Sequence, residues 1–135
     1  MKMTRHGDYE LLVRFPVWSE FQVHVVFTDD IGRSKNGRYG TNDIDVDHTN
    51  ALHVFDLSGH SHLFYLIGNC PSGVVVHECW HAIRAMLEKW AGVDVMENET
   101  VAYHLGYLAQ RVFDFRNDLI DAGIGVKSNK QQEEK

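Results

Sequence analysis

Two histidines and a glutamate stand close together in the stretch VVVHECWHAI, residues 74–83. His77 and His81 are four residues apart, and Glu78 directly follows the first histidine. Residues four apart lie on one face of an α-helix, so the two imidazoles can direct nitrogens at the same point. Glu78 is turned by about 100° from His77 around the helix axis and can instead reach a water bound at that point. Zinc hydrolases use this pattern: the histidines hold zinc and the glutamate takes the water's proton.

A helix with two half-buried, hydrogen-bonded histidines is the alternative that involves no metal. The chain has nine histidines among 135 residues, which makes a chance match to the pattern a real alternative. Histidine is also the commonest metal ligand, and the otherwise apolar stretch is typical of a buried active-site helix. We therefore predict one Zn²⁺ per chain at this helix.

A third ligand is expected on a neighbouring element, because catalytic zinc usually has three protein ligands and leaves the fourth position to water. Glu99 lies 18 residues after His81, near the start of the next expected helix. If that helix returns along the first, the carboxylate of Glu99 comes to lie opposite the two histidines.

These residues carry a resemblance to the gluzincins, the thermolysin-like zinc metallopeptidases. HECWH at residues 77–81 is similar to their His-Glu-x-x-His motif, and NETVAY at 98–103 to the Asn-Glu pair of their second helix. The resemblance covers residues 74 to about 110. In size the chain looks like the short gluzincins of bacteria and phages.

The resemblance implies a role for each matching residue. His77, His81 and Glu99 would be the zinc ligands, and Glu78 the general base. It also implies an α+β fold of the minimal zincin-like kind. In that fold a twisted mixed β-sheet is followed by an active-site helix and a glutamate-bearing helix.

The chain departs from the thermolysin-type pattern at two positions. That pattern has a Ser-Asp pair where this chain has Ala102 and Tyr103, and the aspartate supports a zinc-bound histidine. Tyr103 cannot supply a carboxylate, so the supporting partner must come from elsewhere, and its loss typically lowers metal affinity or activity. The metzincins need a third histidine at the position of Leu87, which excludes that family.

Peptide hydrolysis also needs a group that stabilises the oxyanion, in addition to the metal. The candidates are tyrosines and histidines on the second helix and near the strand before the first: Tyr103, His104, Tyr107, Tyr65, His62 and His60. Each of them can equally have a structural role. His24 and His53 lie within expected strands and are interpreted as ordinary sheet histidines.

The hydrophobic pattern predicts the elements that must position these residues. Segments rich in β-branched and aromatic residues predict strands at 9–18, 20–28, 51–59 and 62–68. Residues 29–48 are rich in glycine and charged side chains, which predicts a long loop with a short strand at 44–46.

Two helices are expected in the second half of the chain. The first covers 72–91, with Ser72 as its cap, Gly92 at its end and a broad apolar face. That face consists of Val75, Cys79, Ala82, Ile83, Met86, Leu87 and Trp90. The second helix runs from about Asp94, which can form a capping box with Glu97, to about residue 118.

Length and composition predict one domain over residues 1–120, with a disordered polar tail at 121–135. The resemblance to gluzincins implies that this domain is zincin-like. The formal net charge of −6 argues against nucleic acid as a partner. No apolar run is long enough to span a bilayer, and the first ten residues lack the apolar core of a signal peptide. We therefore expect a cytoplasmic protein, with Cys70 and Cys79 as reduced core thiols.

The leading hypothesis is a zinc-dependent peptidase that acts on a peptide or protein substrate. The substrate would pair with an edge strand, which we expect at residues 61–67. The alternative is a catalytically weak or inactive zincin-fold protein that binds zinc and acts through a protein partner. The missing support aspartate favours this alternative, and the intact Glu78 argues against it. Hydrolysis of a non-peptide amide is a third possibility.

Overall fold

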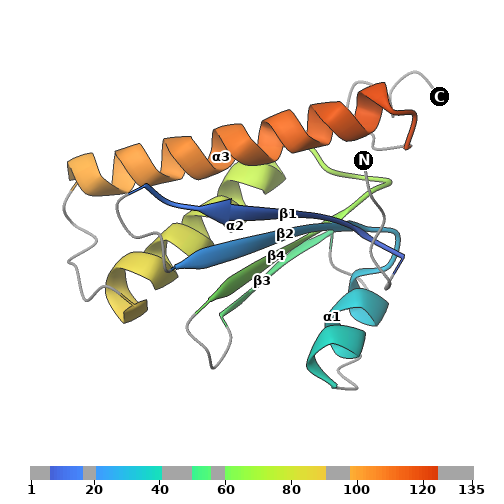
Figure 1. The fold of residues 1–135 in the computed structure, drawn as a ribbon, viewed down its shortest axis with the longest axis horizontal. Helices are drawn as coiled ribbons and strands as arrows, with labels where there is room; N and C mark the ends of the chain where they lie inside the picture. Colours follow the sequence, from blue (N-terminus) through green and yellow to red (C-terminus); the bar gives the residue numbers. More distant parts are fainter. Residues whose placement is uncertain (1–6, 17–20, 41–49, 56–59, 91–97, 125–135) are drawn as a thin grey trace.

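A computed structural model describes residues 7–16, 21–40, 50–55, 60–90 and 98–124 (Figure 1). The elements follow in chain order as β1 (Tyr9–Arg14), β2 (Gln22–Thr28), α1 (Ile31–Tyr39), β3 (Ala51–Phe55), β4 (Ser61–Leu66), α2 (Ser72–Ala85), the π-helical turn η2 (Met86–Trp90) and α3 (Asn98–Asp121). In the described residues this is a mixed α+β arrangement of a four-stranded sheet and three α-helices, which confirms the α+β part of the predicted fold class. All four predicted strands are present, although β1 ends at Arg14 and β4 at Leu66, before the ends that we predicted.

The strands lie in the order β1-β2-β4-β3. β2 and β4 are parallel, whereas β1 pairs antiparallel with β2 and β3 pairs antiparallel with β4. The prediction of an edge strand at residues 61–67 is wrong, because residues Ser61 to Tyr65 of β4 have partners on both sides. The edge strand beside β4 is β3.

The two faces of the sheet carry different side chains, because successive side chains of a strand point to opposite sides. One face forms the main core with α2 and α3, and the other packs against α1 (Figure 1). The main core takes from β2, β3 and β4 the residues Val23, Val25, Phe27, Ala51, Phe55, Leu63 and Tyr65. The second cluster takes from these strands Val26, Leu52, Val54, Phe64 and Leu66. By this alternation His53 lies on the α2 side, and His24 and His62 lie on the α1 side.

Helix α1 occupies part of the predicted loop at 29–48, so that prediction is wrong for Ile31–Tyr39. Asp30 caps the helix by accepting a hydrogen bond from the Arg33 backbone N–H at 3.0 Å. Gly40 ends it in the left-handed conformation, with φ 64°, which glycine adopts without strain. The predicted short strand at 44–46 lies outside the described residues.

Ion pairs hold α1 against the start of the chain. Arg33 and Arg38 approach opposite oxygens of the fully buried Asp8 at 3.0 and 3.1 Å, and Ser34 Oγ donates to Asp8 at 2.6 Å. Burial alone would raise the pKa of Asp8, but the hydrogen bonds from Ser34, Thr28 and the two arginines lower it. The helix therefore forms without an apolar stripe, which explains why hydrophobic periodicity does not detect it.

Helix α2 and the η2 turn together cover nearly the whole of the predicted helix at 72–91. Its predicted apolar face is buried at Val75, Cys79, Ala82, Ile83, Met86 and Leu87. The predicted cap is wrong: Pro71 is the N-cap residue and makes no side-chain cap. Ser72 is the first helical residue, and its Oγ accepts a hydrogen bond from Arg116 at 3.3 Å. Gly92 lies outside the described residues, and the side chain of Trp90 is not described either.

Helix α3 is longer than predicted at its C-terminal end, where it reaches Asp121. The Gly123 N–H donates to the Ile120 carbonyl and the Ile124 N–H to the Leu119 carbonyl, both at 3.0 Å. This pair of bonds, with Gly123 at φ 75°, is a Schellman motif.

Because Ile124 packs against the main core, the packed structure extends past the predicted domain end at residue 120. Residues 125–135 of the predicted tail, and the predicted capping box of Asp94 and Glu97, lie outside the described residues. Among the described helices, none combines the length and the apolar character that crossing a membrane requires.

Candidate metal centre

His77, Glu78 and His81 gather on the outer side of α2, and their ligand atoms all lie within 4.8 Å of one another. The Nε2 atoms of the two histidines are 3.2 Å apart, and Glu78 Oε2 lies 3.7 Å from His77 Nε2. His77 is exposed, whereas His81 and Glu78 are half-buried. Over the part of the chain that the structure describes, no other three His, Cys, Asp or Glu residues come together in this way.

The spacing of the two imidazole nitrogens fits a zinc ion. Two Zn–N bonds of 2.0–2.1 Å at a tetrahedral angle separate their nitrogens by about 3.3 Å. The observed 3.2 Å is close to that value. Without an ion, the same distance suits a hydrogen bond in which one ring N–H donates to the other ring. The Glu78 carboxylate is near enough to act as a third donor or to lie one water molecule away.

The buried face of α2 fixes the outward direction of the two histidines. Cys79 lies between them in sequence and is fully buried. Beneath it, the Tyr65 hydroxyl of β4 donates to the Val75 carbonyl at 3.0 Å and lies 3.7 Å from Cys79 Sγ. This contact anchors the helix to β4 and leaves the side chains of His77 and His81 on the side of α2 that passes the edge strand β3, where His81 stacks on His53.

Tyr65 therefore holds α2 in place and does not face the histidine pair, although it was a candidate oxyanion stabiliser. Burial is the main cause that raises the pKa of Tyr65 well above its ordinary value, and the neighbouring Cys79 is the next largest cause. Burial likewise raises the pKa of Cys70 and Cys79 to about 12. Both thiols are free and buried, as predicted for core cysteines.

The structure does not bring Glu99, the predicted third ligand, into the group with His77 and His81. Glu99 is exposed in the first turn of α3. The two helices are antiparallel, because Arg116 near the end of α3 donates to the Cys70 carbonyl, just before α2, at 2.9 Å. The start of α3 consequently lies at the same end of the molecule as η2 (Figure 1).

The η2 turn explains why the predicted convergence fails. Residues 82–90 continue the helix and carry the chain roughly 13 Å past His81 before it turns back. Helix α3 must cover a similar length before it is again level with His81. Glu99 is only the second residue of α3, so it lies too early in the helix to reach the pair.

The three candidates on α3 make contacts with other parts of the structure. Tyr103 is 54% exposed and its ring meets the edge of His104. His104 is buried, with Nδ1 2.8 Å from the Thr100 carbonyl, and its ring packs on Phe15. The Tyr107 hydroxyl donates to the Arg14 carbonyl at 3.3 Å, which ties α3 to β1.

The two candidates near β4 take part in other contacts. On the α1 side of the sheet, His62 stacks on His24 with ring centroids 4.6 Å apart, and its Nδ1 is 2.6 Å from the Tyr39 hydroxyl. Its strand position places it on the face opposite α2. His60 Nδ1 accepts a hydrogen bond from the Gln22 backbone N–H at 3.2 Å, which ties it to the start of β2.

His53 on the edge strand β3 is the residue near the pair that sequence reasoning interpreted as an ordinary sheet histidine. Its ring stacks on His81, with centroids 6.0 Å apart and planes 11° from parallel. Its Nε2 lies 2.9 Å from Ser61 Oγ. Burial, and then the nearby His81 and Lys89, lower the pKa of His53 to about 4. Its position between the core-facing Ala51 and Phe55 was the signal that could have placed it under α2.

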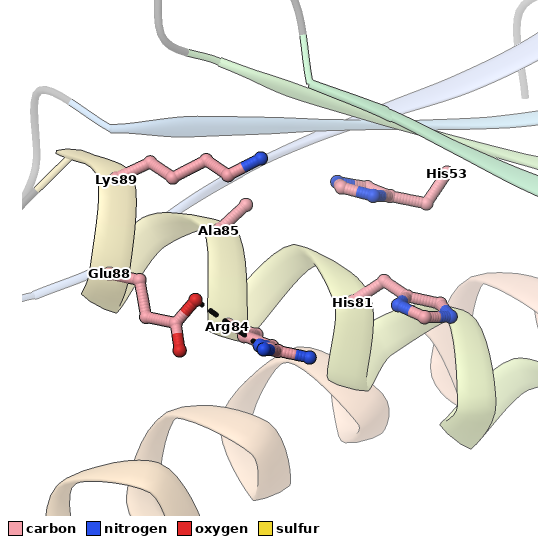
Figure 2. A pocket seen from close by; sticks show the side chains of 6 residues that line it. All are labelled: His53, His81, Arg84, Ala85, Glu88 and Lys89. Carbon is pink, nitrogen blue, oxygen red and sulfur yellow. Dashed lines mark hydrogen bonds and ion pairs between the residues drawn. The ribbon is translucent and has the colours of Figure 1, made fainter. Parts of the chain in front are cut away.

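Two cavities flank the histidine pair where α2 passes β3. The larger, of about 400 Å³, is lined by Asn50, Ala51, Gly73, Val74, His77 and Glu78. The smaller, of about 230 Å³, is lined by His53, His81, Arg84, Ala85, Glu88 and Lys89 (Figure 2). Because residues of β3 contribute to both cavities, we call the two together the edge groove.

Comparisons with known proteins give no further assignment. The chain matches no protein-family model, no curated protein and no solved structure. The resemblance to gluzincins therefore rests on the motif residues at 77–81 and 98–103. The separation of the His77 and His81 nitrogens is a geometric observation independent of that resemblance.

Proposed function

We propose that this protein is a zinc-dependent peptidase of the gluzincin type, with His77 and His81 as metal ligands and Glu78 as general base. The observation that carries the proposal is the 3.2 Å separation of the two Nε2 atoms beside a carboxylate. One turn of α2 brings all three groups together beside the edge strand β3. Imidazole nitrogens are ligands that zinc accepts, which supports zinc as the metal.

Bound at this pair, zinc would polarise the scissile carbonyl and lower the pKa of a water molecule. Glu78 would accept the proton of that water and deliver it to the leaving amine. Its side chain is only 12% exposed, although it lies beside the 65% exposed side chain of His77. Partial burial keeps the carboxylate in one place and limits its competition with bulk water.

The substrate would lie in the edge groove along β3, in place of the strand at 61–67 that we predicted from sequence. The outer edge of β3 has no partner strand among the described elements, so its backbone groups can pair with an extended peptide. His53 on this strand stacks on His81, which places the edge beside the metal ligands. The cavities on either side would take substrate side chains.

The arrangement of elements supports the minimal zincin-like architecture as part of this proposal. A mixed sheet precedes the helix that carries the motif, an antiparallel edge strand lies beside that helix, and a second helix follows. The position of Glu99 departs from that architecture. The metal would then have two histidines from the chain, together with Glu78 or solvent.

This departure favours a second candidate, a zinc-binding protein with little or no hydrolytic activity. If Glu78 is itself a ligand, it cannot also serve as the base. Its 3.7 Å distance from His77 Nε2 is compatible with either role. Such a protein would act through a protein partner and keep the metal as a structural element. Hydrolysis of a non-peptide amide would use the same residues as the peptidase.

Substitution of Glu78 by glutamine tests the peptidase directly, because it keeps the shape of the side chain and removes the base. A mixed peptide library is incubated with zinc-loaded wild type and with Glu78→Gln, with and without chelator. We expect hydrolysis by the wild type, lost with chelator and lowered about 10²–10⁴-fold in the variant. Zinc content and thermal stability should stay unchanged.

Three results would contradict the proposal in different ways. Hydrolysis that survives in Glu78→Gln would remove Glu78 as the base. Loss of zinc in the variant would make Glu78 a ligand and favour the second candidate. A wild type that cleaves no peptide in the library, while it still binds zinc, would also favour that candidate.

A further inference from the structure

The smaller cavity of the edge groove is the one that contains cationic side chains, Arg84 and Lys89, and we call it the charged pocket. His53 of β3 forms one wall, and α2 with the η2 turn forms the others. Ala85, which is 5% exposed, leaves room between the longer side chains. Figure 2 shows the side chain of Lys89 extended over Ala85 in the direction of His53. His81 lines the pocket as well, so the pocket opens beside the metal ligands.

The charges in this pocket do not cancel. Arg84 Nε and Glu88 Oε2 form an ion pair at 3.2 Å on one side (Figure 2). On the other side the Lys89 ammonium lies 5.5 Å from the centre of the Phe55 ring. Among the described residues, no carboxylate forms an ion pair with Lys89. One positive charge is therefore left over, in a chain whose formal net charge is −6.

A single cation over a cavity of about 230 Å³ suits a small anionic group. The Lys89 ammonium, 5.5 Å from the centre of the Phe55 ring, can approach such a group, and Arg84 can add a second donor if its bond to Glu88 loosens. In a groove that would hold an extended peptide, the small anionic group is the carboxylate of an aspartate or glutamate side chain.

The direction of β3 indicates which side of the cleaved bond this residue occupies. The strand runs from Ala51 at the larger cavity to Phe55 beside Lys89. An antiparallel substrate strand, the slightly more stable pairing, runs the opposite way. Its N-terminal part then lies at the charged pocket, and its C-terminal part lies at the larger cavity beside Glu78.

We propose that the charged pocket binds an acidic side chain of the substrate on the N-terminal side of the cleaved bond, with Lys89 as the specificity-determining residue. This inference rests on the proposed function. It names the substrate class as peptides with a glutamate or aspartate next to or near the scissile bond. The Arg84–Glu88 ion pair sets how strongly the pocket attracts that carboxylate.

The test uses peptides that differ only by glutamate or glutamine at each position around the cleaved bond. Cleavage sites are mapped by mass spectrometry with the zinc-loaded wild type. Binding of the same peptides is measured by titration calorimetry with zinc-loaded Glu78→Gln, which does not depend on hydrolysis. We expect about tenfold preference for glutamate on the N-terminal side, in cleavage and in binding.

Three further variants assign the preference to the pocket. Lys89→Glu should reverse it in favour of lysine-containing peptides, and Lys89→Gln should abolish it. Glu88→Gln should strengthen it, because Arg84 is released. The matched control is Arg14→Glu, which makes the same change in net charge at β1, the opposite edge of the sheet. It should leave the preference unchanged.

Failure of the inference and failure of the proposed function give different results. Cleavage without a preference for glutamate, or with a preference that Lys89→Glu and Lys89→Gln leave intact, overturns the pocket and leaves the peptidase. Binding of the glutamate peptide that depends on Lys89, with no cleavage by the wild type, supports the pocket and overturns the peptidase. If the wild type cleaves none of the peptides and none of them binds, both the pocket and the peptidase are overturned.

Discussion

Two pairs of histidines lie at similar separations in the described part of this molecule, but only one belongs to a group whose ligand atoms come close enough to share a metal ion. The rings of His77 and His81 on α2 have centroids 4.8 Å apart, and those of His24 and His62 on the sheet are 4.6 Å apart. We call His77 and His81 the helix pair, and His24 and His62 the sheet pair. The rings of the helix pair meet edge to face, with planes at 83°, whereas the rings of the sheet pair are stacked, with planes at 10°.

The backbone that carries each pair causes this difference. His24 and His62 are direct partners in the parallel register of β2 and β4, so their side chains leave the sheet in the same direction and stack. The nitrogen lone pairs of stacked rings lie in parallel planes and cannot meet at one ion. One turn of helix instead brings the Nε2 atoms of the other pair to 3.2 Å. Ring proximity alone therefore does not make a metal site.

The largest expected effect is on zinc affinity when one histidine of the helix pair is removed. His77→Ala or His81→Ala should weaken zinc binding at least 100-fold, because a single imidazole remains. His62→Ala should change the affinity less than twofold. Competition with a fluorescent zinc chelator measures all three. Equal losses in the helix and sheet variants would remove the distinction between the pairs.

The next effect concerns His53, the imidazole stacked on the helix pair. Its pKa is lowered to about 4, chiefly by burial, from an ordinary 6.5. Between pH 6.5 and 4 the unfolded chain therefore binds a proton at this position that the folded chain does not. Its contribution to stability is complete above pH 6.5 and is lost as the pH falls towards 4.

Urea unfolding of the zinc-free protein at several pH values measures this contribution. The free energy of unfolding of the wild type should fall with acid by on the order of 2 kcal/mol more than that of His53→Gln. Parallel curves for the two proteins would mean that His53 titrates normally.

A smaller effect is expected from the hydroxyl that anchors the helix pair. Tyr65→Phe removes the hydrogen bond to the Val75 carbonyl and should lower the free energy of unfolding by about 1 kcal/mol. Zinc affinity should stay within twofold, because His77 and His81 remain on the same turn. Chemical denaturation and zinc titration check the two parts. A large loss of zinc affinity would mean that Tyr65 orients the ligands themselves.

The smallest expected effect is that of Glu99→Ala. The first turn of α3 does not reach the helix pair, so zinc affinity should remain within about twofold of the wild type. The same chelator competition measures it. A loss as large as that of His77→Ala would make Glu99 the third ligand and would require α3 to be placed differently.

The structural features that depend on local periodicity were predicted correctly from the sequence. The strands follow from runs of β-branched and aromatic residues, and the outward position of His77 and His81 follows from their spacing of four on a helix whose other face is apolar. These features are properties of single elements.

The features that we did not predict correctly depend on contacts between distant parts of the chain. Helix α1 is held by ion pairs to Asp8 and has no apolar stripe to reveal it. The interior place of β4 follows from strand order, which no single segment determines. Glu99 was placed by assuming where the chain turns back, and the η2 turn moves that point. His53 became relevant only when β3 was seen to be the edge strand beside α2.

X-ray absorption at the zinc edge, combined with elemental analysis, tests most directly that the helix pair binds zinc. Zinc-loaded wild type should contain about one zinc per chain, with two imidazole nitrogens at about 2.0–2.1 Å. A double variant, His24→Ala with His62→Ala, should give the same spectrum and stoichiometry. The double variant His77→Ala with His81→Ala should lose the metal. A wild type without zinc, or a spectrum without imidazole ligands, would contradict the account.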